Sequence, residues 1–201
     1  MSIEDFEDIL EKELNLSGSD KVSGHRYHFG YAKLLYGKKI KSVLEIGIAN
    51  GWIDNSASSI GAWGKIFPEA EIYAIDIDPD KVEAQKDFAK TYVVDQSSKE
   101  SLEVFVKKTH LKDISFILDD GSHYFNHAKL TFEILFDSLA EDGVYIIEDI
   151  VKIPSGWNPW QQNKQDWENY LSGIEGIQYL IIDTKPSLND DSLLIGIWKK
   201  G

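Results

Sequence analysis

The spacing of hydrophobic residues divides this chain into a helical beginning and a longer part in which strands and helices alternate. Near the start, apolar side chains return every three or four positions, at Ile3, Phe6, Leu10 and Leu14. This spacing predicts a helix over residues 3–14, and Ser2 with Asp5 has the pattern of a reciprocal N-terminal cap. An aromatic-rich segment over residues 26–36, followed by Gly37, predicts a second helix.

From residue 42 onward, short apolar runs are separated by segments with helical spacing. The runs of strand length are residues 43–46, 72–75, 92–94, 114–118 and 144–147. Helices are expected between them, including one that opens at Pro79 and continues to about Lys90, and one that carries Leu135 and Leu139 on one face. This alternation predicts a doubly wound parallel sheet with right-handed crossovers.

The end of the chain departs from this alternation. Residues 177–182 and 192–198 have the pattern of strands joined by a turn-rich connection, which predicts an antiparallel hairpin at one sheet edge. The expected fold class is therefore α/β, with a doubly wound, mostly parallel, seven-stranded sheet and a C-terminal antiparallel hairpin. Residues 1–201 are expected to form a single domain, with a helical cover over 1–40 and the α/β core over 41–201.

Composition narrows the classes of partner. The chain has 201 residues, no cysteine and a formal net charge of −13. This charge opposes binding to nucleic acid or to an anionic membrane, because both need clustered lysine and arginine. No apolar run approaches the roughly 20 residues that a membrane-spanning helix needs, and the acidic first residues lack the basic start of a secretory signal. We therefore expect a cytoplasmic protein without disulfides or thiolate metal sites.

Two of the expected strands end in paired carboxylates. One ends in Asp119-Asp120-Gly121-Ser122-His123 and a later one ends in Glu148-Asp149. Neighbouring parallel strands end at the same sheet edge, so both acidic pairs are expected to face one crevice. Carboxylates gathered there repel one another unless a cation or a bound partner lies among them. Carboxylate ligands favour a hard cation such as Mg²⁺, Mn²⁺ or Ca²⁺ over zinc.

The first half of the expected sheet carries a second set of polar strand ends. A glycine-containing turn over residues 47–51 follows the first strand, Asp76 ends the second, and Asp95 follows the third. A turn between strand and helix lets the backbone approach a ligand closely, and a carboxylate at the next strand end can accept hydrogen bonds from a ribose diol. Together these features predict a nucleoside ligand lying across the first three strands.

These segments resemble a known family. Glu45-Ile-Gly47-Ile-Ala-Asn-Gly51, Ile75-Asp-Ile-Asp-Pro79 and Asp95-Gln-Ser97 look like the cofactor motifs of class I S-adenosylmethionine-dependent methyltransferases. More narrowly, Leu118-Asp-Asp-Gly-Ser-His123 followed by Gly143-Val-Tyr-Ile-Ile-Glu-Asp149 is similar to the metal-dependent sugar O-methyltransferases of macrolide biosynthesis, the macrocin and mycinamicin type. The resemblance covers roughly residues 17–150.

The resemblance implies roles for individual residues. It implies that S-adenosylmethionine is held by Glu45, Gly47, Gly51, Asp76, Asp95, Gln96 and Asp119, with the glycines at the methionine moiety, Asp76 at the ribose, and Asp95 with Gln96 near the adenine. It implies that Mg²⁺ is bound by Asp120, Glu148 and Asp149, and that His123 is the catalytic base.

The chemistry of such a reaction agrees with these residue types. A sugar hydroxyl must lose its proton as it attacks the sulfonium methyl group, and a divalent cation bound to that oxygen lowers the cost. The near-neutral pKa of a histidine suits the base. The expected partner is a small-molecule hydroxyl acceptor, such as a sugar or a glycosylated metabolite, and a homo-oligomer is compatible with the sequence. The chain is much shorter than the macrolide enzymes, so their acceptor and assembly do not transfer.

Other interpretations remain open at this point. The acceptor could be a catechol-like phenol, or the chain could be a non-catalytic nucleoside-binding module of the same fold. An NAD-dependent oxidoreductase is opposed by Ala49 and Trp52, which stand where the dinucleotide fingerprint needs glycines. A zinc site on His123 and His127, four residues apart on one helical face, lacks the Glu of an H-E-x-x-H motif. For Asp119 a structural role is the alternative, either capping the following helix or accepting backbone N–H groups.

The tryptophan-rich stretch after the second acidic pair has two interpretations. Residues 151–173 are expected to hold a loop and a helix over the cleft, and they contain Trp157, Trp160 and Trp167. Trp157 and Trp160 could stack against a sugar ring or could simply pack in the core. His25 and His28 would reach the cleft only if the N-terminal helices fold over the sheet.

Overall fold

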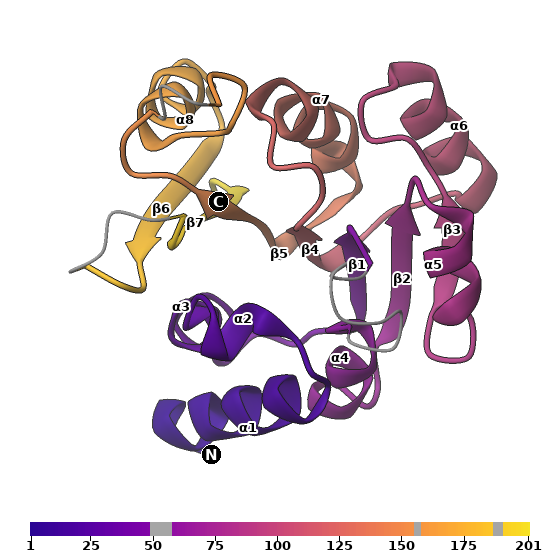
Figure 1. The fold of residues 1–201 in the computed structure, drawn as a ribbon, viewed down its shortest axis with the longest axis vertical. Helices are drawn as coiled ribbons and strands as arrows, with labels where there is room; N and C mark the ends of the chain where they lie inside the picture. The colour runs from indigo at the N-terminus through magenta and orange to yellow at the C-terminus, as the bar shows by residue number, and fades with distance from the viewer. Residues whose placement is uncertain (49–57, 155–157, 187–190) are drawn as a thin grey trace.

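The computed structural model describes residues 1–48, 58–154, 158–186 and 191–201. Its centre is a seven-stranded sheet with the order β3-β2-β1-β4-β5-β7-β6 (Figure 1). The strands are β1 Ser42–Ile46, β2 Glu71–Asp76, β3 Lys90–Val93, β4 Ile114–Asp119, β5 Leu139–Ile150, β6 Ile177–Asp183 and β7 Leu193–Lys199. The first five pair in parallel, and β7 lies antiparallel between β5 and β6. The predicted sheet and its terminal hairpin are therefore confirmed.

Helices cover both faces of this sheet. They are α1 Ile3–Leu16, α2 Asp20–Ser23, α3 Tyr27–Leu35, α4 Ile60–Ile66, α5 Pro79–Ala84, α6 Lys99–Thr109, α7 Phe125–Leu135 and α8 Lys164–Leu171, with a 3-10 turn, η1, at Phe136–Ser138. On one face, Tyr31 of α3 and Trp63 of α4 pack edge-on against each other and against Phe116 of β4. In a second apolar core on the other face, side chains of α6, α7 and α8 pack against side chains of the strands. In the described residues, no helix has both the length and the apolar composition needed to cross a bilayer.

Several predicted boundaries are correct and others are wrong. The first helix has the expected capping box between Ser2 and Asp5. The helix from Pro79 ends at Ala84 rather than near Lys90, because none of its residues is buried and so no apolar stripe extends it. Leu139 does not lie on the face of α7; it begins β5 and pairs with Ile114.

The N-terminal helices are fixed to the sheet by a close helix–strand contact. A Cβ on Gly30 of α3 would lie 2.4 Å from the Leu194 side chain of β7. Gly196 of β7 likewise faces Leu34, whose side chain would lie 2.5 Å from a Cβ there. These two glycines let α3 lie directly on β7. The contact brings α2 and the start of α3 over the carboxyl ends of β1, β4 and β5, where the acidic residues are.

Candidate active site

A single cavity of about 470 Å³ lies over the carboxyl ends of the parallel strands. Residues expected at the cofactor and residues expected at the metal both line this cavity. They are Gly47, Asp76, Asp95 and Gln96 for the cofactor, and Asp120, His123 and Asp149 for the metal and the proton transfer. The sheet order explains this, because β1 lies between β2 and β4. The two sets of polar strand ends that the sequence predicts therefore share one space.

The turn after β1 packs tightly against the first acidic loop. Gly47 has a φ of +88°, a region that favours glycine. A Cβ on Gly47 would lie 2.0 Å from the carbonyl oxygen of Asp120, and its own N–H donates to the Ile75 carbonyl at 2.9 Å. The glycine is thus required by backbone packing between β1 and β4. Gly51, Ala49 and Trp52 lie outside the described residues.

Asp76 and Asp95 both face the cavity with part of their hydrogen-bonding capacity already used. The two oxygens of Asp76 accept from the N–H groups of Ile48 at 2.9 Å and Asp78 at 2.8 Å. Asp95 accepts from the backbone N–H and hydroxyl of Ser97, and these bonds hold the pKa of the Asp95 carboxyl below its usual value. A carboxylate oxygen can accept more than one hydrogen bond, so both residues can still receive hydroxyl or amine groups of a ligand.

Asp119 supports the acidic loop from beneath. Its Oδ1 accepts from Gln96 Nε2 at 2.7 Å and from the Gly121 N–H at 3.3 Å, and Gln96 Oε1 accepts from the Ser122 N–H. Burial raises the pKa of Asp119 to about 6, while the bonds from Gln96 and Gly121 act in the opposite direction. Asp119 is not among the described residues that line the cavity. The structure therefore favours the backbone-binding alternative over direct contact with a cofactor.

Glu45 is held by protein groups. The residue is only 1% exposed, and its oxygens accept from the Ser59 hydroxyl and from Trp63 Nε1, the latter at 2.6 Å. Its Oε1 also lies 3.7 Å from the Lys21 ammonium. Glu45 borders the cavity, but its hydrogen bonds hold α4 against β1 and its ion pair with Lys21 links β1 to α2.

The acidic strand ends bring Asp120, His123 and Asp149 together. Each of these residues offers one ligand atom, and the three atoms lie within 4.8 Å of one another. His123 Nδ1 lies 3.3 Å from Asp149 Oδ2. Both residues have positive φ values, +58° for His123 and +54° for Asp149, which are uncommon outside glycine and are often found at functional sites.

Glu148 does not belong to this compact group, although the sequence places it beside Asp149. Its side chain is fully buried, and Oε2 lies 2.5 Å from the ammonium of Lys21. Its second oxygen, Oε1, is buried and has no hydrogen-bond partner among the described residues. Of the three expected metal ligands, the structure thus brings Asp120 and Asp149 together with His123, and it holds Glu148 against a lysine.

Lys21 is the residue of this site that the sequence did not reveal. It lies on α2, is 2% exposed, and donates to both Asp120 and Glu148. Burial opposes the charged form, but Asp120, Glu148 and Glu45 outweigh burial and hold the pKa of Lys21 well above its usual value. In the sequence, Lys21 sits in a short polar break between helices, where a lysine normally faces solvent. No signal in the sequence separates it from the other lysines.

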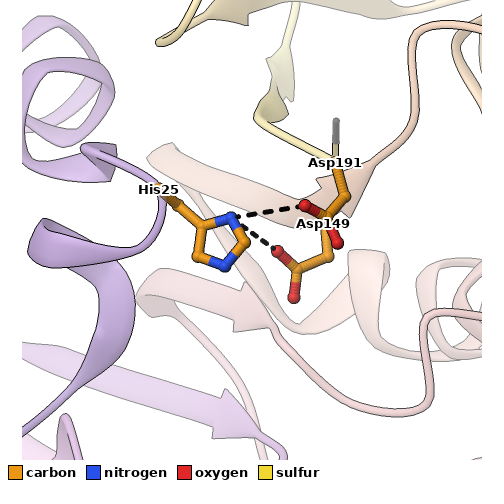
Figure 2. A group of neighbouring side chains, drawn as sticks. All are labelled: His25, Asp149 and Asp191. Carbon is orange, nitrogen blue, oxygen red and sulfur yellow. Dashed lines mark ion pairs between the residues drawn. The ribbon is translucent and has the colours of Figure 1, made fainter. Parts of the chain in front are cut away.

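The N-terminal cover also brings His25 and Tyr27 to Asp149. Figure 2 shows His25 pointing at two carboxylates, with Nδ1 3.6 Å from Asp149 Oδ1 and 3.6 Å from Asp191 Oδ1. The Tyr27 hydroxyl lies 2.7 Å from Asp149 Oδ1 and 2.7 Å from the Asp191 carbonyl oxygen, and it accepts from the Asp149 N–H. His28, in contrast, is buried beside Phe29.

The prediction that His123 and His127 lie on one helical face is wrong. His123 precedes α7 with a left-handed backbone, so it does not share a helical face with His127. His127 Nδ1 lies 2.9 Å from the Ser122 hydroxyl instead. The break occurs because α7 begins only at Phe125.

A short segment after β5 ties the two acidic loops together. Gln162 donates through Nε2 to the Glu148 carbonyl and through its backbone N–H to the His123 carbonyl at 2.9 Å. Trp160, just before it, is 66% exposed, whereas Trp167 is fully buried in the core. Trp157 lies outside the described residues. The two tryptophans that the structure describes in this region are therefore one surface side chain and one core side chain.

The chain is similar in sequence to known sugar O-methyltransferases. No family model matches the chain. It is 32% identical over 137 residues to 8-demethyl-8-alpha-L-rhamnosyl tetracenomycin-C 2'-O-methyltransferase of Streptomyces olivaceus, covering 66% of this chain and 35% of the relative. It is 33% identical over 112 residues to mycinamicin VI 2''-O-methyltransferase of Micromonospora griseorubida, covering 54% and 27%. The matched part is between about a quarter and a third of each relative's length.

Solved structures show the same fold. The MycE methyltransferase of the mycinamycin biosynthetic pathway, in complex with Mg, SAH and mycinamycin VI, superposes with a TM-score of 0.73 at 20% identity, covering 94% of this chain and 54% of that one. A TehB-like SAM-dependent methyltransferase of Corynebacterium glutamicum gives 0.56 at 19% identity and covers 94% of both chains. This chain therefore has the class I methyltransferase fold, and its sequence is similar to those of sugar O-methyltransferases.

Proposed function

We propose that this chain carries out S-adenosylmethionine-dependent, Mg²⁺-assisted O-methylation of a hydroxyl group on a sugar or small diol in secondary-metabolite or glycan biosynthesis. The observation that carries the proposal is the single cavity in which Gly47 and Asp76 face the same space as Asp120, His123 and Asp149. A methyl donor and a hydroxyl acceptor must meet in such a space. The similarity to sugar O-methyltransferases supports the same chemistry.

The side chains at the acidic strand ends fit a hard divalent cation. Asp120 and Asp149 offer carboxylate oxygens within 4.8 Å of each other and of His123, and Mg²⁺ prefers such ligands. The buried Oε1 of Glu148 has no partner among the described residues, and an unpaired carboxylate oxygen is costly to bury. Asp120 and Asp149 would hold Mg²⁺, and Glu148 would join them through this free oxygen.

The other half of the cavity suits the methyl donor. We assign the Gly47 turn to the methionine part of S-adenosylmethionine, Asp76 to the ribose hydroxyls, and Asp95 with Gln96 to the adenine. Asp76 uses its backbone bonds to Ile48 and Asp78 to keep a fixed orientation. Its remaining acceptor capacity then matches the two hydroxyls of a ribose.

The proton is handled by His123. When bound, the divalent cation lowers the pKa of the acceptor hydroxyl. Asp149 Oδ2 lies 3.3 Å from His123 Nδ1 and orients the ring, and Nε2 would accept the proton of the hydroxyl. The hydroxyl oxygen then attacks the sulfonium methyl group, and S-adenosylhomocysteine leaves. Asp149 would therefore both orient the His123 ring and bind the cation.

The domain organisation follows from the same contacts. We propose that residues 1–201 work as one domain and that the cover over residues 1–40 is part of the site. Lys21 and Tyr27 support this, because they contact Glu148 and Asp149 at the end of β5. Removal of the cover would expose these carboxylates.

The experiment that tests the function has two stages. Isothermal titration with S-adenosylhomocysteine and, separately, NADH should show binding of the first alone. Methyl transfer should then be measured by S-adenosylhomocysteine release with a panel of rhamnosyl glycosides, other vicinal diols and catechol, with Mg²⁺ or EDTA. Turnover of a glycoside only with Mg²⁺ is expected. Turnover of catechol alone would move the acceptor to phenols, and NADH binding without S-adenosylhomocysteine binding would overturn the proposal.

A further inference from the structure

Lys21 lies where a cation would be expected among the acidic strand ends. Its ammonium donates to Asp120 Oδ2 and lies 2.5 Å from Glu148 Oε2 and 3.7 Å from Glu45 Oε1. In the described part of the chain it is the only buried lysine. Its partners come from three neighbouring strands, because Glu45 lies in β1, Asp120 directly follows β4 and Glu148 lies in β5.

The charges around Lys21 are unbalanced without it. Glu45 and Glu148 are almost completely buried, and Asp120 is about three-quarters buried, with 24% of its side chain exposed. An unpaired buried charge is strongly destabilising, and removing one partner of a buried pair leaves the other uncompensated. Lys21 therefore stabilises the folded chain by neutralising carboxylates that would otherwise repel one another.

Two of these three carboxylates, Asp120 and Glu148, are also proposed to bind the metal. Asp120 is shared between the compact group with His123 and Asp149 and the ion pair with Lys21. Glu148 is not part of that group. One of its oxygens is bound to Lys21, and the other has no hydrogen-bond partner among the described residues. Lys21 and a divalent cation would thus compete for the same two carboxylates, Asp120 and Glu148.

We propose that the Lys21 ammonium is a built-in counter-ion of the metal site, so that Lys21 and a bound divalent cation each weaken the other's interaction with Asp120 and Glu148. The inference rests on the proposed function, since it takes Asp120 and Glu148 as metal ligands. It goes further by giving the N-terminal cover an electrostatic role. Two cations a few ångströms apart repel strongly in a buried site, and the cover supplies one of them.

The test compares Mg²⁺ binding with stability. Lys21→Met keeps the aliphatic stem and removes the charge, and Lys65→Met removes an exposed lysine of α4 as a matched control. Isothermal titration with Mg²⁺ and thermal unfolding in EDTA or Mg²⁺ are measured for both variants and the wild type. Lys21→Met should have a lower Tm in EDTA, a larger rise in Tm with Mg²⁺, and an affinity for Mg²⁺ about tenfold higher than the wild type. Lys65→Met should match the wild type.

Each other outcome has a defined meaning. Weaker Mg²⁺ binding by Lys21→Met would overturn the inference and make Lys21 a brace that positions the ligands. Absence of Mg²⁺ binding by both wild type and variant would overturn the metal site of the proposed function instead. If Lys21→Met folds only with Mg²⁺, the cation replaces the ammonium and the inference is supported.

A second variant keeps the inference testable if Lys21→Met does not fold at all. Lys21→Met combined with Glu148→Gln removes a positive and a negative charge together, so the double variant should fold in EDTA. It should also lack the gain in Mg²⁺ affinity. A double variant that fails to fold would show that removing a carboxylate charge does not compensate for the loss of the ammonium, which would overturn the inference that Lys21 acts as a counter-ion.

Discussion

The carbonyl oxygen of Asp120 lies 2.0 Å from the point where a Cβ on Gly47 would stand. The backbone that carries a proposed metal ligand is therefore packed directly on the turn proposed to hold the methyl donor. Any side chain on Gly47 must push these two loops apart.

Replacing Gly47 by alanine should disturb both halves of the cavity. We expect the variant to lose about 2–4 kcal/mol of unfolding free energy, from the left-handed backbone and from overpacking together, and to lose S-adenosylhomocysteine binding. Gly37→Ala is the matched control, because Gly37 has a φ of +77° and nothing within 4 Å of its Cβ position. Urea unfolding and isothermal titration measure the difference. Equal losses in the two variants would mean that the close approach to Asp120 has no cost.

His123 should affect turnover and leave donor binding intact. We expect His123→Ala to lower kcat by about 10²- to 10⁴-fold, as for loss of a general base, with the affinity for S-adenosylhomocysteine within about twofold of the wild type. His110→Asn, at the end of α6 with a φ of +51°, is a suitable control outside the cavity lining. Full kcat in His123→Ala would assign the proton to another group.

The two carboxylates beside His123 should determine metal affinity. Asp120→Asn and Asp149→Asn are each expected to weaken Mg²⁺ binding by tenfold or more, since each removes a charged oxygen ligand. Asp183→Asn serves as the control, because Asp183 pairs with Lys152 at the end of β6. Isothermal titration with Mg²⁺ gives the comparison. Unchanged affinity in both site variants would place the metal elsewhere.

Asp119 should make stability depend on pH. Burial raises its pKa from 3.8 to about 6, so between about pH 4 and pH 6 the folded chain binds a proton that the unfolded chain has lost. The contribution of this group to the free energy of unfolding therefore falls as the pH rises through this window. Asp119→Asn, which keeps the hydrogen bond from Gln96 to an amide oxygen, should lose less stability than the wild type between pH 4.5 and pH 7.5 in urea titrations. Parallel pH profiles would contradict the assignment.

The sheet could be predicted from the sequence because its signals are local. The first five strands each include or overlap a short, mostly apolar run, and a polar residue follows within one or two positions, as for Asp76 and Asp120. The parallel order then brings those ends together without further information. The helix from Pro79 was predicted too long because none of its residues is buried, so the spacing of its residues carried little information about where the helix ends.

The contacts that complete the site could not be predicted because they join distant parts of the chain. Lys21 and Glu148 are 127 positions apart, and neither the polar break around residue 21 nor the pattern of β5 indicates the other. The resemblance implies that Glu148 binds the metal. One of its oxygens lies instead against Lys21, and the backbone of the neighbouring Asp149 leaves the extended conformation with a φ of +54°. The approach of α2 depends on Gly30 and Gly196, whose small size matters only once α3 and β7 are packed.

The span of these contacts also has a consequence for how the molecule folds. The Tyr27 hydroxyl meets the Asp191 carbonyl across 164 positions, nearly the length of the chain. Closing a loop of this size costs conformational entropy. Contacts between the ends compensate for this cost only after the intervening strands have formed. We therefore expect the acidic residues to stay hydrated while the sheet assembles. Their burial against the N-terminal helices would then be among the last steps of folding and among the first to be lost when the native state opens.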